Sequence, residues 1–431
     1  MSPEIFGIIG IAAVVFLLIA RMWIGLAMAM VGFLGLAALR GLEGAFGVLG
    51  TVPYKYVAFY PISAIPLFVF MAMVISNTGI GASLFKTAHT WLGQLRGGLA
   101  MAGVLASGGL AAIMGDSVAE VVTMGQVAVP EMRKYKYDDQ LATGSVAAGG
   151  TLGILIPPSL GFILYGILTE QSVGMLFMAG ILPGILLTFL FLVAIRIITA
   201  FRPSAGPPGP KTSLKEKIVS LKGTWHVLLL FLLIIGGIYG GIFTPTEAGG
   251  VGAFGAIVIS AVSQRLTIKI LLDSLLEATK ITAMIMLLIV GAFILMKFLA
   301  LSKLPFMLSQ AIGGQSLPPF AVFTGIILLY IILGMFLDIF SAIVLTIPLI
   351  FPLVMEMGFD PIWFGVIMVL VMEMGLITPP VGLNVFALAG VTGIPLHIIF
   401  RGVLPFLLAM IICIIFLTFF PKIALFLPSL M

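Results

Sequence analysis

Charged residues are scarce in this chain: they make up only 9% of its 431 residues, whereas 61% are hydrophobic. A soluble domain carries about 25% charged residues, which keep its surface solvated. The composition therefore excludes a water-soluble globule and indicates a polytopic membrane protein. The 51 glycines and 25 prolines lie within strongly apolar stretches, as is common in membrane helices, so they do not indicate disorder.

Cysteine, histidine and phosphate-binding loops are scarce or absent as well. Cys413 is the only cysteine, so no disulfide can form within the chain. The three histidines are far apart and have no metal-ligand spacing. No Gly-Lys dipeptide occurs, so the chain lacks the phosphate loop of an ATP-driven pump. Its net charge of +5 comes from basic residues scattered in loops, which set membrane topology rather than bind nucleic acid.

Uncharged stretches follow one another along the whole chain, and a helix needs about 20 apolar residues to cross a bilayer. Some stretches are too long for one crossing, and others have the length of half-helices. We therefore predict an all-α polytopic membrane protein with about 11–13 membrane segments. The predicted segments include two re-entrant hairpins and two broken helices.

A basic, Pro/Gly-rich linker at 202–222 divides the chain into halves at 1–201 and 223–431. Its positive charge predicts a cytoplasmic location. The loop 131–139 is also basic, but the loop 353–361, which lies 222 residues later, has no Lys or Arg. Equivalent loops on opposite sides of the membrane indicate an inverted-topology repeat, the architecture of many secondary transporters. Further landmarks match at the same offset: Asp116 with Asp338, Pro130 with Pro352, Asp138 with Asp360, and Gly153 with Gly375.

Each half contains a proline pair inside an apolar run, Pro157-Pro158 and Pro379-Pro380. Proline removes a backbone donor and clashes with the preceding turn, so two in series should break the helix. The carbonyl groups freed there need partners, because lipid supplies none. Unwound carbonyls of this kind can coordinate Na⁺. The carbonyl candidates belong to Gly153, Ile156, Gly375 and Thr378. Two simple kinks are the alternative, and their matched positions argue against it.

Polar turns interrupt two other apolar regions. The turn Gly115–Ser117 lies between segments that are short for full spans, and a basic loop follows, which predicts a re-entrant hairpin with this turn at its tip. Its counterpart holds Asp338 and Ser341. A carboxylate within a membrane is costly and indicates function, unless the tip is close enough to the surface to be hydrated. Other acids in apolar stretches are interpreted as helix-packing or interfacial groups: Glu120, Glu247 and Glu373.

Four segments carry motifs in a characteristic order. They are HTWLGQLRGGLAMAGVLAS at 89–107, ILIPPS at 154–159, FTPTEAG at 243–249 and GFDPIWFGVIMVLVMEMGLITPPVGLNVFALAGV at 358–391. Together they resemble the large membrane subunit of tripartite ATP-independent periplasmic (TRAP) transporters, the DctM-like family. The resemblance covers nearly the whole chain. It implies an elevator-type, Na⁺-driven uptake system for organic acids in the bacterial inner membrane, with no enzymatic activity and no cofactor besides the coupling ion.

The resemblance also implies two partners and two ion sites. The partners are a soluble periplasmic substrate-binding protein and a small four-helix membrane subunit, here expected as a separate chain. One Na⁺ site would comprise Gly115, Asp116, Gly153, Ile156 and Pro158, and the other Asp338, Gly375, Thr378 and Pro380. The first tip departs from the family pattern, because Met114-Gly115-Asp116 stands where Ser-Gly-Ser is usual. The added carboxylate would either tighten cation binding or titrate.

Our mechanistic hypothesis places a carboxylate substrate between the two tips, facing half-helix N-termini and the side chains of Ser117, Thr151, Ser341 and Asn384. A H⁺-coupled anion transporter of the same fold is one alternative. An intramembrane aspartyl protease is a remote one, since its dyad must share a proton at short range and has no use for broken helices. The amphipathic segments 80–96 and 265–280 are either interfacial arm helices or connectors.

Overall fold

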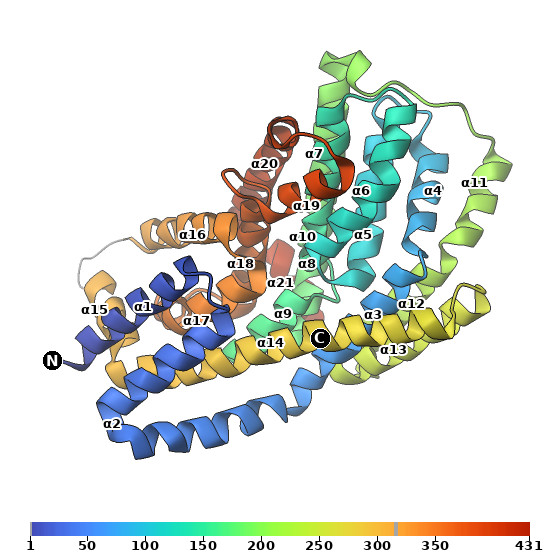
Figure 1. The fold of residues 1–431 in the computed structure, drawn as a ribbon. Coiled ribbons are helices and arrows are strands. Elements are labelled where there is room, and N and C mark those ends of the chain that lie inside the picture. Colours follow the sequence, from blue (N-terminus) through green and yellow to red (C-terminus); the bar gives the residue numbers. More distant parts are fainter. Residues whose placement is uncertain (1, 314–317) are drawn as a thin grey trace.

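The computed structural model describes residues 2–313 and 318–431, and every regular element in these ranges is a helix (Figure 1). The first half contains α1 (Pro3–Ile19), α2 (Ile24–Val57), η1 (Tyr60–Ser63), α3 (Ala64–Asn77), α4 (Gly81–Leu92), α5 (Gly98–Met114), α6 (Ser117–Lys134), α7 (Asp139–Gly150), α8 (Leu152–Leu155), α9 (Leu160–Thr169) and α10 (Val173–Phe201). The linker region contains η2 (Pro203–Ala205), α11 (Leu214–Ser220) and η3 (Leu221–Gly223).

The second half has a similar order of long and short helices. It contains α12 (Trp225–Tyr239), α13 (Pro245–Val262), α14 (Ile268–Ser302), α15 (Leu304–Gly313), α16 (Pro319–Phe336), α17 (Ile339–Glu356), α18 (Pro361–Leu376), α19 (Leu383–Thr392), α20 (Leu396–Phe419), α21 (Lys422–Leu425) and η4 (Pro428–Leu430). Helices α6 and α17 have 18 residues each and begin 222 residues apart, and α7 and α18 begin at the same spacing. The helix bounds thus follow the offset found in the sequence.

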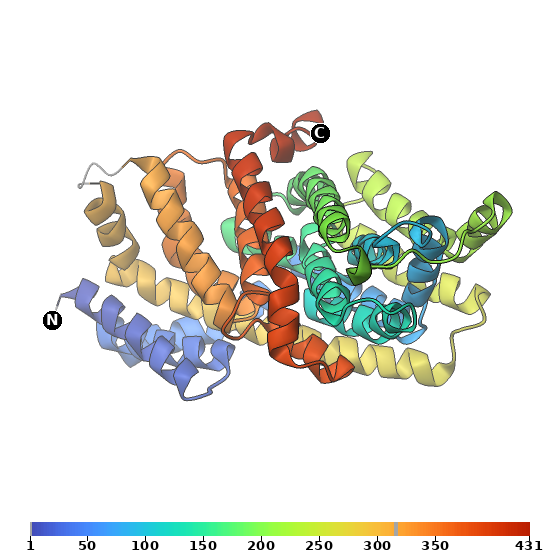
Figure 2. The ribbon, with the colours of Figure 1, turned by 90° about the horizontal axis from the view of Figure 1, so that it is seen from above.

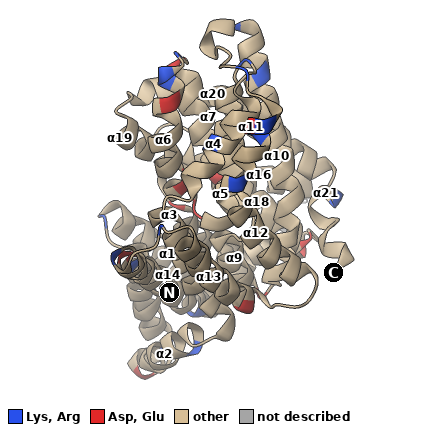
Figure 3. Cartoon of the chain, turned by 90° about the vertical axis from the view of Figure 1, so that its right-hand side faces the viewer, with Lys and Arg blue, Asp and Glu red and all other residues tan. Residues whose placement is uncertain are grey.

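The described part of the chain has nine helical segments long and apolar enough to cross a membrane, or ten if the bent pair Leu214–Gly223 and Trp225–Tyr239 is one span. Four shorter apolar helices, α1, α5, α18 and α19, accompany them. Charged residues gather mostly at helix ends and loops (Figure 3). The prediction of an all-helical, polytopic membrane protein is therefore confirmed. The two re-entrant hairpins, and the way in which the shorter helices enter the bilayer, stay predictions.

Helices α2 and α14 form a long pair along one side of the molecule (Figure 1). They approach closely because glycines face each other: a Cβ atom on Gly291 would overlap the carbonyl oxygen of Gly25. Near Gly291 on α14, the ring of Phe293 stacks on that of Tyr56, with centroids 3.4 Å apart. Helix α2 bends at Gly41, whose φ of 81° is a conformation that favours glycine.

The two amphipathic segments belong to helices of different kinds. Segment 265–280 contains the first turns of α14, which continues without a break to Ser302. Segment 80–96 contains α4, which packs against α5 and against α11 of the linker. The linker is therefore docked rather than free: Trp91 donates a hydrogen bond to the carbonyl of Lys217 (3.2 Å), and Thr212 donates one to that of Thr90 (2.7 Å).

The two halves pack into each other at the centre of the molecule. Helix α6 of the first half packs against α19 of the second, and α17 of the second packs against α9 of the first. Viewed from above, the red α20 lies between the orange helices of residues 319–376 and the teal helices of the first half (Figure 2). The hydroxyl of Tyr165 on α9 donates to the carbonyl of Pro361 at the start of α18 (2.7 Å). The helix that follows each proline pair therefore packs against a helix of the other half.

Candidate ion and substrate site

The first proline pair interrupts a helix, as predicted. Helix α8 ends at Leu155 and α9 begins at Leu160, and Ile156 between them is extended with φ −86° and ψ 123°. The bond between Pro157 and Pro158 is cis. Ser159 then caps α9 by accepting a hydrogen bond from the backbone N–H of Phe162 (3.2 Å). The N–H of Ile156 still donates to the carbonyl of Leu152 (2.9 Å), as in a helix, and the buried Pro157 and Pro158 that follow belong to neither helix.

The second pair interrupts a helix in the same way. Helix α18 ends at Leu376 and α19 begins at Leu383. The Pro379-Pro380 bond is also cis, and Gly382 has a φ of 63°. Thr378 lies in the break: its N–H donates to the carbonyl of Gly375 (3.0 Å), and its hydroxyl donates to that of Met374 (2.6 Å). A carbonyl oxygen has two lone pairs, so Gly375 retains one for another partner.

The first hairpin tip lies directly against the first break. Gly115 ends α5 with a φ of 61°, and a Cβ atom there would be 2.9 Å from the carbonyl oxygen of Pro158. A Cβ atom on Gly153 would be 3.2 Å from the carbonyl carbon of Asp116. Both glycines therefore allow the backbone of the tip to touch the backbone of the break. The structure brings together four of the predicted first-site residues, and Ile156 lies between Gly153 and Pro158.

The second tip meets the second break through α16. A Cβ atom on Gly375 would be 2.6 Å from the Cα of Gly334, and the N–H of Gly382 donates to the carbonyl of Met335 (3.3 Å). Asp338 lies just after the end of α16 and caps α17, because its carboxylate accepts hydrogen bonds from the N–H of Ser341 (3.0 Å) and from the Ser341 hydroxyl. This second region is more open than the first, since Pro380 is exposed and Thr378 half-buried.

The tips and breaks surround a group of carboxylates that the sequence interpretation underrated. Glu120 on α6 and Glu373 on α18 are both 0% exposed, and neither carboxylate has a hydrogen-bond partner among the described residues. Glu120 lies against Gly153, where a Cβ atom would be 2.8 Å from its Oε2. Asp116 is within electrostatic range of Asp338, Glu120 and Glu373. Acids of the two halves therefore influence one another electrostatically.

These carboxylates do not form a metal cluster of their own. In residues 2–313 and 318–431, no group of three Asp, Glu, His or Cys side chains is close enough to hold one metal ion. A cation bound here would need carbonyl or hydroxyl oxygens as well. No hydrogen bond joins Asp116 to Asp338 among the described residues, and each caps its own helix: Asp116 accepts from the N–H of Val118 (3.1 Å), and Asp338 from that of Ser341. This geometry disfavours the aspartyl protease.

The four predicted substrate-facing side chains divide into two pairs. Thr151 and Ser341 are satisfied locally, the first by the carbonyl of Ala148 (2.6 Å) and the second by Asp338. Ser117 and Asn384 are 0% exposed, and no hydrogen bond of good geometry pairs their polar side-chain atoms in the described part of the chain, although the Ser117 hydroxyl lies within reach of the Glu373 carboxylate. A buried polar group without a partner is costly, so Ser117 and Asn384 are the better candidates for contacts to a bound molecule.

The sequence alone led us to interpret Glu120 and Glu373 as helix-packing or interfacial acids, and it indicated no role for Ser107. The hydroxyls of Ser107 and Ser117 are also buried without partners, and they lie beside Glu120 and Glu373, respectively. Their positions in the sequence could have indicated that they lie near the site, because Glu120 follows the first tip and Glu373 precedes the second break. Glu247, in contrast, is an exposed member of a capping box with Thr244, in agreement with its predicted structural role.

Comparison with known proteins gives one consistent family. Residues 11–423 match the family model described as "Tripartite ATP-independent periplasmic transporter, DctM component". The C4-dicarboxylate TRAP transporter large permease protein DctM of Pseudomonas aeruginosa is 37% identical over 400 residues, which cover 90% of this chain and 93% of that protein. The sialic acid TRAP transporter large permease protein SiaM of Vibrio cholerae is 33% identical over 372 residues, covering 86% and 87%.

Solved structures give the same fold at low sequence identity. The YdaH transporter of Alcanivorax borkumensis superposes with a TM-score of 0.60 at 16% identity, covering 88% of this chain and 90% of that one. MtrF of Neisseria gonorrhoeae superposes with a TM-score of 0.57 at 12% identity, covering 88% and 85%. The matched family and relatives are transport proteins rather than enzymes. This chain belongs to the DctM family of TRAP transporter large permease proteins.

Proposed function

We propose that this permease takes up a small organic acid across the bacterial inner membrane, coupled to Na⁺, by an elevator mechanism. The observation that carries this proposal is the contact between each polar hairpin tip and its broken helix, around buried carboxylates with no partner. Na⁺ would bind at the two breaks, one near Gly115, Asp116 and Pro158 and the other near Asp338 and Thr378. Oxygen-only ligands of this kind, including unwound carbonyls, suit Na⁺.

The substrate is proposed to lie between the tips. An anion there would face the N-termini of α6 and α17, where the helix dipole favours negative charge. Bound cations would offset the repulsion from the neighbouring carboxylates. Ser117 and Asn384 supply unpartnered donors for the substrate. Support for a carboxylate comes from the relatives, which are named as transporters of C4-dicarboxylate, sialic acid and 2,3-diketo-L-gulonate.

The transport cycle that we propose needs two partners. A periplasmic binding protein would deliver the acid to the outward face, and a small four-helix membrane subunit, a separate chain, would complete the scaffold. The body containing both sites would then slide against the α2–α14 pair. The Na⁺ gradient supplies the energy, since one charge moving through 100 mV is worth about 2.3 kcal/mol.

Replacing Asp338 with Asn tests the coupling ion. D338N keeps a side chain that can cap α17 but removes the charge, so we expect it to raise the Na⁺ requirement at least about tenfold or to abolish uptake, because about 1.4 kcal/mol of lost Na⁺ binding corresponds to a factor of ten. The measurement is uptake of labelled succinate and sialic acid into proteoliposomes that contain the permease and small subunit, with the loaded binding protein outside.

Asp360 provides the matched control, because it caps α18 with two hydrogen bonds of 2.9 Å and lies away from the tips. D360N should leave the Na⁺ dependence unchanged. Unaltered Na⁺ dependence in D338N would remove Asp338 from the site. Uptake driven by a pH gradient without Na⁺ would favour the H⁺-coupled alternative. The extra carboxylate of Asp116 is the observation that supports this alternative.

A further inference from the structure

A cavity of about 390 Å³ lies outside the proposed transport site, where the start of α7 meets the end of α10 and the first turns of α20. Two arginines line it from different helices: Arg202 at the end of α10 and Arg401 on α20. Asp138 and Gln140 line the side formed by α7. Two arginines that meet at one cavity indicate a site for an anion.

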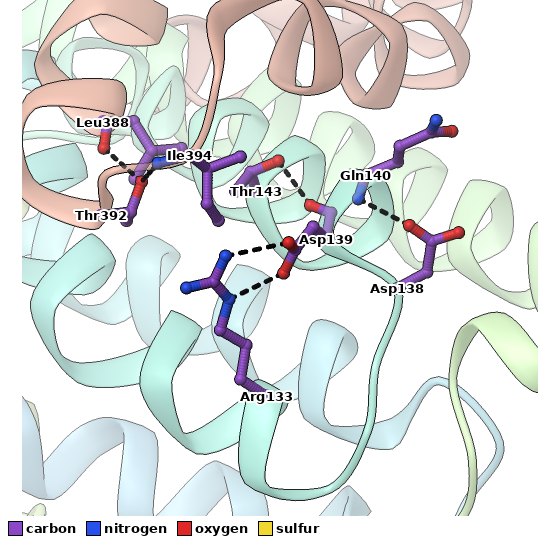
Figure 4. Close-up of polar contacts among 8 residues, drawn as sticks. All are labelled: Arg133, Asp138, Asp139, Gln140, Thr143, Leu388, Thr392 and Ile394. Carbon is purple, nitrogen blue, oxygen red and sulfur yellow. Dashed lines mark hydrogen bonds and ion pairs between the residues drawn. The ribbon is translucent and has the colours of Figure 1, made fainter.

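The arginines are available to a ligand. Within the described residues, neither makes a hydrogen bond or an ion pair through its side chain; the ion pairs there join Arg133 to Asp139 and Lys134 to Glu131. The acid that faces the cavity, Asp138, accepts a hydrogen bond from the N–H of Gln140 (2.8 Å) and so caps α7. Figure 4 shows Asp138 and Gln140 on the side of α7 away from the Arg133–Asp139 pair.

The remaining wall is apolar and partly exposed. Ile197 and Phe201 of α10 line the cavity and are 51% and 86% exposed, and Pro405 of α20 lines it too. Helices α10 and α20 are both long and apolar enough to span a membrane. The exposed side chains near the arginines therefore offer a path for an acyl chain, which a soluble anion would not need.

The neighbouring loops assign the cavity to one leaflet. The basic loop 131–139 and the basic linker 202–222 meet here, since the N–H of Asp138 donates to the carbonyl of Ala205 (3.0 Å). Both segments carry the positive charge typical of cytoplasmic loops. Anionic lipids bind basic pockets between helices on this side of a membrane. We propose that the cavity binds the head group of an anionic phospholipid, with Arg202 and Arg401 at its phosphate and an acyl chain along Ile197 and Phe201.

The test is lipid binding to the purified full chain in neutral detergent, followed by native mass spectrometry with phosphatidylglycerol as the probe. Each arginine contributes about 1 kcal/mol near a membrane surface, so R202Q and R401Q should each weaken binding about fivefold. The control is R196Q, because Arg196 is an exposed arginine of α10 that does not line the cavity. Its affinity for phosphatidylglycerol should equal that of the unmodified chain.

Two further arms identify the ligand chemistry. Zwitterionic phosphatidylcholine should bind more weakly than phosphatidylglycerol, and R202Q and R401Q should not change its affinity. Inorganic phosphate in large excess should not displace the bound phosphatidylglycerol. The proposal is overturned if R202Q and R401Q bind phosphatidylglycerol as tightly as R196Q does, or if phosphatidylcholine binds equally well. Displacement by inorganic phosphate would also overturn it, since the site would then recognise a free anion.

Discussion

Among the individual residues, Glu120 and Glu373 are expected to cost the most folding free energy, because both carboxyl groups are fully buried. Ionising a carboxyl group that is buried away from any counter-charge costs several kcal/mol, and both side chains are 0% exposed with no cationic partner among the described residues. Other carboxylates are their charged neighbours, so their mutual repulsion adds to this cost. A bound cation would remove both penalties. The ion-free protein should therefore be less stable than the Na⁺-bound one.

Substitution of Glu373 by Gln tests this balance. In K⁺ buffer we expect E373Q to unfold at a higher temperature than the unmodified protein, because glutamine removes the cost of keeping a buried carboxyl group next to other acids. The additional stabilisation by Na⁺ should shrink, since fewer charges remain to attract the ion. Thermal unfolding of the purified protein in detergent, with and without Na⁺, measures both effects.

Glu247 supplies the control for that experiment, since it is exposed and forms a capping box with Thr244. E247Q should leave the stabilisation by Na⁺ intact, because the Glu247 side chain is exposed and bonded within its own helix cap, and a glutamine can still serve in a capping box. If E373Q were less stable in K⁺ and stabilised by Na⁺ as much as before, Glu373 would have no part in ion binding.

At the scale of single elements, the start of α6 combines two roles in one residue. Asp116 caps the helix through the N–H of Val118, and its charge lies next to the first break. The preceding Gly115 has a positive φ, which turns the chain from α5 into α6. Substitutions that keep the cap but remove the charge can separate the two roles.

We expect D116A to destabilise the protein by about 1 kcal/mol, because alanine cannot cap α6, whereas D116N should cost only a few tenths. Both substitutions should weaken the stabilisation by Na⁺, since both remove the charge. The measurement is again thermal unfolding in Na⁺ and K⁺ buffers. Equal stabilisation by Na⁺ in D116N and the unmodified protein would limit Asp116 to capping.

The whole molecule raises the question of orientation. An inverted repeat requires the α6–α7 and α17–α18 loops to lie on opposite sides of the membrane. Lys134 and Glu356 end α6 and α17, respectively, and both are exposed. The natural Cys413 is buried and should react slowly, so single introduced cysteines can report on each loop.

In intact spheroplasts, a membrane-impermeant maleimide should label E356C but not K134C. After the membrane is opened, both should react, because both positions are exposed to water in this arrangement. The readout is the mass of the labelled protein, with the unmodified chain as the control for Cys413. Labelling of both variants from the same side would contradict the inverted repeat.

Local chemistry made part of this structure predictable. Both helix interruptions follow from the proline pairs, since proline removes a donor and restricts the residue before it. The 222-residue offset anticipated the shared bounds of α6 and α17. The tip at Gly115 and Asp116 was recognisable because glycine and a capping residue are typical of a helix-to-helix turn. The long continuous α14 was not anticipated, because its first turns carry charges that look like a loop or an interfacial segment.

By itself, the sequence determined that this is a helical membrane protein of the DctM family with two interrupted helices, because apolar length, proline and motif order act locally. Only the tertiary structure decided which polar groups meet. It placed Glu120 and Glu373, from different halves, within electrostatic range of each other and buried the polar side chain of Asn384 without a partner among the described residues. It also placed Arg202 beside Arg401. The physical reason is that burial and electrostatic proximity depend on contacts between distant segments, which no local pattern specifies.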